Sequence, residues 1–231
     1  MSSDWGHARY SVFDKELQAH VSHIRRLDIT GFWGKSSSFL WTTLQHTLVG
    51  SPAPILEYLS LSTTNPDREL FLADNVFNGI NPRLSYLKLH KIDINWKSSL
   101  LRGLRYLEIY ELKDDYRLSV TDWLDALDKM PQIKELVLCA ASPLAGSLTF
   151  SFDIKCTATL PVLLRLELSS TAEAYALALA HLVLPALTSL NLILNAQSTD
   201  HRGHDALILF RYLTQHAHAP GRQASPERAL P

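Results

Sequence analysis

The chain has 231 residues, of which 46% are hydrophobic and 19% charged, the composition of an ordinary globular protein with enough residues to bury a core. Its 22 Lys and Arg nearly balance its 23 Asp and Glu, so it lacks the positive charge with which general nucleic-acid and membrane-surface binders attract their targets. Two cysteines, Cys139 and Cys156, are too few for a disulfide scaffold or a cysteine zinc site. We expect an intracellular protein, cytoplasmic or nuclear, with no nucleic-acid or membrane partner.

One spacing of apolar residues, apolar-x-x-apolar-x-apolar, recurs seven times along the chain. In chain order the segments are 24–29 (IRRLDI), 56–61 (LEYLSL), 84–89 (LSYLKL), 104–109 (LRYLEI), 133–138 (IKELVL), 163–168 (LLRLEL) and 187–192 (LTSLNL). Five of them have proline two residues before the first apolar position: Pro54, Pro82, Pro131, Pro161 and Pro185. This is the spacing of a leucine-rich repeat.

The spacing has a geometric meaning. The first apolar residue turns into the interior from a loop, and the next two lie on the inward face of a short strand, where side chains alternate. The proline ends the preceding segment and lets the chain become extended. The sequence therefore predicts an α/β leucine-rich-repeat solenoid, with about seven parallel strands on the concave face and helices or loops on the convex face. Leu87, Leu107 and Leu136 should lie on adjacent strands.

The segments between these strands are expected to return along the convex side. Helical spacing predicts helices at 12–21, 37–51, 119–130, 171–183 and 205–217, the third capped by Ser119 or Thr121. Residues 69–79 should form only a turn or two, and 93–100 (DINWKSSL) an extended crossing or a short 3₁₀ turn. The predicted organisation is an N-terminal segment at 1–20, partly a helical cap, a repeat domain at 21–218, and a disordered tail at 219–231.

Outward-facing residues of the strands supply the candidate binding surface. The third place of each repeat reads Arg26, Tyr58, Tyr86, Tyr106, Glu135, Arg165 and Ser189. Three consecutive tyrosines form a stripe, with rings expected to lie on solvent, and interface hot spots favour Tyr and Arg. The residues predicted to contact a partner are Tyr58, Tyr86, Lys88, His90, Tyr106, Glu108 and Tyr110. The alternative is cross-strand stacking that only stabilises the sheet.

Motifs for catalysis, phosphate binding or metal binding are absent from the sequence. His216 and His218 flank one alanine, which is a poor metal site without a third ligand. Cys139 is expected to be a small apolar residue beside a strand, and Glu111 to belong to a solvated charged turn. We therefore expect no enzyme activity, no cofactor and no metal, although an enzyme site in a loop stays open as the weakest alternative.

Three longer runs carry a family resemblance: 72–112 (LADNVFNG…RYLEIYEL), 123–144 (WLDALDKMPQIKELVLCAASPL) and 177–192 (LALAHLVLPALTSLNL). Together with the repeats around them, over about residues 20–218, they resemble the leucine-rich region of F-box proteins from mushroom-forming fungi. The resemblance implies a substrate-recognition module of a cullin-type ubiquitin ligase, whose partner is a protein or peptide that the sequence does not name.

One part of that family's pattern is missing. An F-box begins with Leu-Pro and continues as a patterned run of about 40 residues in that family, and no such run precedes residue 20. We expect a truncated member, a fragmentary gene model or a paralogue without the F-box. A ubiquitin-ligase adaptor is then a partner only if an F-box lies upstream. A free-standing or degenerate leucine-rich-repeat protein stays open as the alternative.

Overall fold

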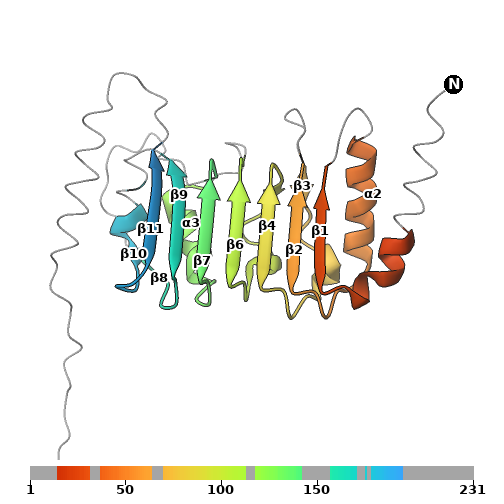
Figure 1. Cartoon of the computed structure of the whole chain (residues 1–231), viewed down its shortest axis with the longest axis horizontal. Helices are drawn as coiled ribbons and strands as arrows, with labels where there is room; N and C mark the ends of the chain where they lie inside the picture. The colour runs from red at the N-terminus through yellow and green to blue at the C-terminus, as the bar shows by residue number, and fades with distance from the viewer. Residues whose placement is uncertain are drawn as a thin grey trace, which may run out of the picture.

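The computed structural model of the chain describes residues 15–31, 37–63, 70–112, 118–141, 157–170, 175 and 178–194. It is an α/β protein whose main sheet has seven strands, all parallel (Figure 1). These strands are β1 (Arg26–Thr30), β2 (Tyr58–Ser62), β4 (Tyr86–His90), β6 (Tyr106–Tyr110), β7 (Glu135–Cys139), β9 (Arg165–Ser170) and β11 (Ser189–Leu194). They lie side by side in chain order, so each crossover joins neighbouring strands.

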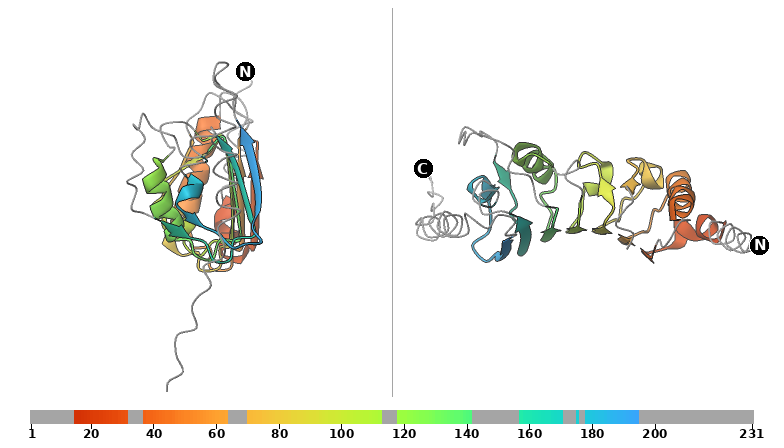
Figure 2. Two further views of the ribbon diagram at one scale, coloured as in Figure 1. Left: turned by 90° about the vertical axis from the view of Figure 1, so that its left-hand side faces the viewer. Right: turned by 90° about the horizontal axis from the view of Figure 1, so that it is seen from above.

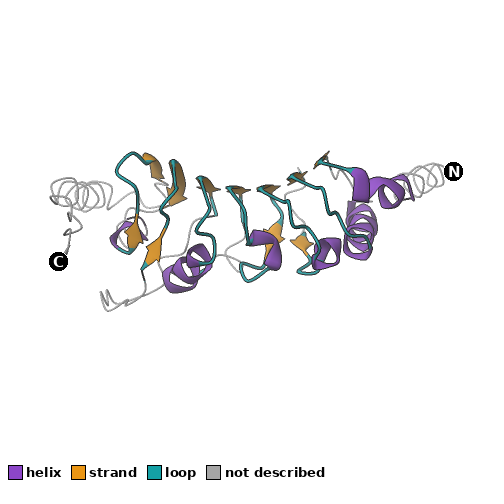
Figure 3. Cartoon of the chain, turned by 90° about the horizontal axis from the view of Figure 1, so that it is seen from below, coloured by secondary structure: helices purple, strands orange, loops and turns teal. Residues whose placement is uncertain are grey.

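The remaining elements lie behind this sheet. They are the helices α2 (Ser37–Gly50) and α3 (Val120–Asp128), the 3₁₀ turns η2 (Val76–Gly79) and η3 (Ser99–Leu101), and the strand pairs β3 (Phe71–Leu72) with β5 (Asp93–Ile94) and β8 (Ala158–Thr159) with β10 (Leu182–Val183). Figures 2 and 3 show them on one side of the sheet, and no described helix covers the other side, here called the open face. None of the helices in the described ranges has the length and apolar character to cross a bilayer.

On β2, β4, β6, β7 and β9, two inward apolar residues of each strand are buried and build the core. Leu87, Leu107 and Leu136 are fully buried and face one another on β4, β6 and β7, as the spacing predicts. The second inward row is buried in the same way at its centre, through Leu89 and Ile109. Burying a side chain of this size contributes about 1.5–3 kcal/mol, so these two rows supply much of the energy that holds the strands together.

A hydrogen-bonded turn leads into most of the strands, and proline has a defined place in it. The N–H of the first apolar residue donates to the carbonyl three residues earlier, as from Leu56 to Ala53 at 3.2 Å and from Leu84 to Asn81 at 3.1 Å. The same bond closes the turns at 130–133 and 160–163. In all four turns the proline is the second residue, where its fixed φ favours the turn. This turn explains the shared proline better than helix termination does.

The turn before β11 is displaced by one residue, which corrects the prediction for the seventh segment. Here Thr188 N–H donates to the Pro185 carbonyl at 3.1 Å, so proline is the first residue of the turn. Leu187 consequently lies inside the turn and is 90% exposed instead of buried. Leu190 is also exposed, because no strand in the described ranges packs beyond β11.

The predicted convex elements are confirmed in part. Residues 37–50 and 120–128 are helical, and the Ser119 hydroxyl caps α3 by accepting the Asp122 N–H at 3.2 Å. The prediction of a helix through 171–183 is wrong at its end, because 182–183 form β10 and pair with β8. Helix at 15–20 continues into η1 (Val21–His23) beside β1. The predicted helix at 205–217 and the tail at 219–231 lie outside the described residues.

Tyr175 fastens the last two strands together. Its hydroxyl accepts the Ser170 N–H at 2.6 Å and lies within hydrogen-bonding range of two carbonyls, those of Leu168 at 2.7 Å and of Ile193. The ring is buried, and this burial raises the pKa of the phenol to about 12. The phenol is therefore protonated at neutral pH and can donate its one proton to either carbonyl.

We predict that Tyr175→Phe lowers the free energy of unfolding by about 1–3 kcal/mol, because it leaves the part-buried Ser170 N–H and two carbonyls without this partner. Urea unfolding measures the change. Tyr106→Phe is the control, because its ring lies on the open face and only a hydroxyl is removed there too. Equal losses in the two variants would contradict the role given to Tyr175.

Candidate functional site

The register of the sheet arranges outward side chains in rows across the open face. Tyr58 pairs with Tyr86, and Tyr86 pairs with Tyr106. Arg26 precedes them on β1 and Glu135 follows them on β7. The third places of successive repeats are thus neighbours in space, as the sequence predicts.

Three tyrosines form a continuous stack in this row, here called the tyrosine ladder (Tyr58, Tyr86 and Tyr106). Ring centroids are 4.5 Å apart between the first two and 5.7 Å apart between the last two, with interplanar angles of 23° and 29°. The guanidinium of Arg26 lies 4.0 Å from the centroid of the Tyr58 ring and extends the stack by a cation–π contact. All three tyrosines are half-buried, because each ring covers part of its neighbour. This differs from the expectation that the rings lie on solvent.

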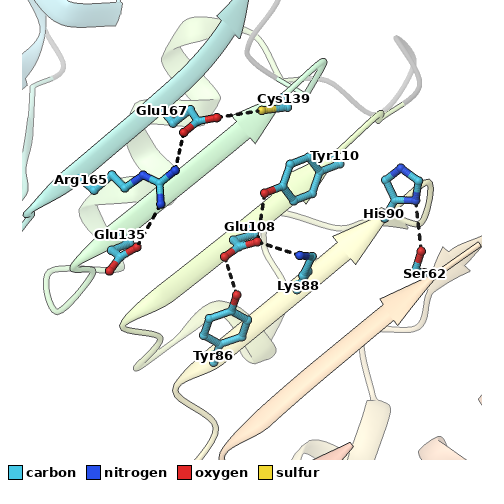
Figure 4. Close-up of polar contacts among 10 residues, drawn as sticks. All are labelled: Ser62, Tyr86, Lys88, His90, Glu108, Tyr110, Glu135, Cys139, Arg165 and Glu167. Carbon is cyan, nitrogen blue, oxygen red and sulfur yellow. Dashed lines mark hydrogen bonds and ion pairs between the residues drawn. The ribbon is translucent and has the colours of Figure 1, made fainter. Parts of the chain in front are cut away.

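Glu108 is the centre of a hydrogen-bonded cluster beside the ladder (Figure 4). One carboxylate oxygen accepts the Tyr86 hydroxyl, and the other accepts the Tyr110 hydroxyl at 3.0 Å. Lys88 Nζ lies 3.3 Å from the second oxygen and 5.3 Å from the centroid of the Tyr110 ring. The side chain of Glu108 is only 18% exposed, against 38% for Lys88. The carboxylate therefore holds the hydroxyls of Tyr86 and Tyr110 at a partly covered position, and Lys88 is the more accessible charge.

The cluster holds its members in fixed protonation states near neutral pH. Burial alone would raise the pKa of the Glu108 carboxyl, but the hydrogen bond from Tyr86, the charge of Lys88 and the bond from Tyr110 together bring it below its ordinary value. Burial and the neighbouring carboxylate raise the pKa of the phenols of Tyr86 and Tyr110. The anion stays charged and both phenols stay protonated, which suits a rigid binding surface better than proton transfer.

A second polar cluster, on β7 and β9, was not among the predicted site residues. Arg165 lies between two carboxylates, 2.6 Å from Glu167 and 3.8 Å from Glu135, and the Cys139 thiol donates to Glu167 at 3.6 Å (Figure 4). Burial and Glu167 raise the pKa of this thiol to about 11, so it is protonated and unreactive at neutral pH. The alternation of Glu, Arg and Glu at the third and fifth places was the sequence signal for this cluster.

His90 and Glu111 lie at the carboxyl end of the strands. Glu111 is 3.2 Å from both the Nε2 of His90 and the Nζ of Lys91, and the Nδ1 of His90 is 3.2 Å from the Ser62 hydroxyl. Lys91 and Glu111 each follow a strand with φ of 57°, a left-handed conformation that ordinary residues adopt at some cost. This conformation extends the backbone hydrogen bonding between neighbouring strands by one residue, since Lys91 N–H donates to the Tyr110 carbonyl at 2.9 Å.

All seven predicted contact residues lie on the open face, over the three adjacent strands β2, β4 and β6. Lys88 and Glu108 pair with each other, so these two charged residues are not both free to contact a partner around the tyrosines. Arg26 is the residue to add, since it continues the ladder. Whether this surface binds a partner stays a prediction.

In the described ranges, no group of three or more His, Cys, Asp and Glu side chains is placed to hold a metal ion. His216 and His218 lie outside these ranges. Trp41, Trp96 and Trp123 are buried and belong to the hydrophobic core.

Comparison with known proteins assigns no relative: no protein-family model matches this chain, and no curated protein matches it.

We predict that Glu108→Gln destabilises the protein mainly above pH 5. The pKa of Glu108 is lowered by folding, so its charged form adds stability above the unfolded value of about 4.3 and loses it as the pH falls through the folded pKa. At pH 6 the variant should lose about 1.5–3 kcal/mol, the range for hydrogen bonds to a charged group. Urea unfolding at pH 6 and pH 3 checks this, and a loss of equal size at both pH values would contradict it.

Proposed function

We propose that this chain is a protein-interaction module that binds a short peptide or the edge of a helix on its open face. The observation that carries the proposal is the tyrosine ladder, whose half-exposed rings lie on a surface that described helices leave uncovered. Tyrosine and arginine are the side chains most often responsible for binding energy at interfaces. Two strand spacings of about 4.8 Å give the ladder a span of about 10 Å, the width of a peptide or one side of a helix.

The polar groups around the ladder support this function. Glu108 and its partners hold Tyr86 and Tyr110 in place before a partner arrives, which lowers the entropy lost on binding. Lys88 remains accessible at the side and offers a charge for a polar rim. The pKa values of the Cys139 thiol and of the two phenols are raised and that of Glu108 is lowered, so all four are moved away from the neutral range that favours acid–base catalysis.

We also propose the finer fold and the family. The in-register stacking of seven strands, each at one copy of the repeated spacing, supports a leucine-rich-repeat solenoid. The resemblance to fungal F-box proteins then makes substrate recognition for a cullin-type ubiquitin ligase the leading interpretation. Sequencing the transcript upstream of Met1 tests it: an in-frame F-box supports a role in the ligase, and its absence favours a free-standing binder.

We predict that the two ends of the ladder are binding hot spots. Peptides selected on the wild-type chain from a random display library should bind about ten-fold more weakly to Tyr58→Ala and to Tyr106→Ala, which corresponds to about 1.4 kcal/mol for each ring. Fluorescence polarisation measures the Kd. These two positions are chosen because Tyr86 and Tyr110 also hold Glu108, so their loss would disturb the surface itself.

Asp125→Ala and Lys129→Ala are the matched controls. Both side chains are exposed, and they lie in α3 and at its C-terminal end, behind the sheet. They should leave the Kd unchanged, and the melting temperature of every variant is recorded. If the ladder variants lose thermal stability but bind the selected peptides as tightly as the wild type, the stack is structural and the proposal is wrong.

A further inference from the structure

The sheet ends at β11 in an apolar surface. The inward row of β11 is exposed at both of its ends, Leu190 to 43% and Leu194 to 46%, and Leu192 between them is only partly buried. These three side chains lie on one face of the strand, because side chains alternate along it. We call Leu190, Leu192 and Leu194 the β11 surface. Exposed apolar residues grouped in this way indicate a surface that another element covers.

At the opposite end of the sheet, a helical segment covers the first strand. There the helical residues 15–23 lie beside β1, with Leu17 and Val21 buried against the core (Figure 1). No described element has this position beside β11. Among the described residues, no strand pairs with the outer edge of β11, and such an edge favours pairing or covering by another segment.

The chain itself contains a segment suited to this surface. Residues 205–217 (DALILFRYLTQHA) lie outside the described ranges, and their spacing predicts a helix. In such a helix one apolar stripe would form from residues at helical intervals, namely Ala206, Phe210, Leu213 and Ala217, with Leu209 beside them. Ile208 and Gln215 would lie on the opposite side.

The dimensions agree. A helix of 13 residues is about 20 Å long, and a strand of six residues such as β11 is also about 20 Å long. The ten residues 195–204 that join them span up to about 35 Å when extended, which is ample for the chain to return along the strand.

We infer that segment 205–217 docks as a helix on the β11 surface and closes the end of the sheet. A second copy of the chain is the competing occupant, because it carries the same outer edge of β11. The tethered segment has the advantage, since a short linker gives an effective concentration in the millimolar range, far above that of a second molecule in dilute solution. This inference does not depend on the function proposed for the tyrosine ladder.

Hydrogen exchange of the full chain tests the docking. The readout is the amide protection of residues 187–194, with residues 86–90 of β4 as the internal reference for an intact fold. Leu209→Asp/Leu213→Asp should reduce protection at 187–194 at least ten-fold and leave β4 unchanged. The control Ile208→Asp/Gln215→Asp adds the same two aspartates to the opposite side of the helix and should leave both regions unchanged. Should the first variant also lose protection in β4, the milder Leu213→Ser is used for the same comparison.

Three results would overturn the inference. Residues 187–194 could be unprotected in the wild type, or the two double variants could lose protection equally. Alternatively, protection in the wild type could rise with protein concentration together with a dimer mass in light scattering, which would show that a second copy covers the surface. The inference requires a monomer whose protection at 187–194 is independent of concentration.

Discussion

The structure depends on the burial of inward apolar residues, two from each strand between β2 and β9, in a parallel sheet without register shifts. Each motif pairs with the same position of the next motif, so Leu59 meets Leu87 and Leu87 meets Leu107. A slip of one residue would turn these leucines to solvent and would place polar residues in the core. The apolar rows therefore set the register, and the register determines which residues become neighbours on the open face.

The tyrosine ladder is a consequence of this register. Tyrosines that are 28 and 20 positions apart in the sequence stack because all three occupy the residue before an inward leucine. The charged residues that share their face mostly pair among themselves, around Glu108 and around Arg165. The partly exposed aromatic rings, Arg26 and Lys88 are thus the groups that we propose to contact a partner.

The two ends of the sheet differ in how the core meets solvent. At β1, residues 15–23 contribute buried side chains. At β11, a turn displaced by one residue carries Leu187 outward while the strand keeps its pairing with β9. Tyr175 still links the ends of these two strands, so β11 is held firmly although one side of it is apolar and exposed.

The sequence by itself determined the seven strands of the main sheet, their order and their register, because pairing each copy of the repeated spacing with the next brings the inward apolar residues together. It also predicted the rows of the open face, since side chains alternate along a strand. The displaced turn at Leu187, the short strand at 182–183 in place of a helix end, and the partners of Glu108 and Tyr175 were decided by tertiary structure. They depend on hydrogen bonds between residues far apart in the chain and on what packs beyond the last strand, neither of which a local pattern of apolar residues records.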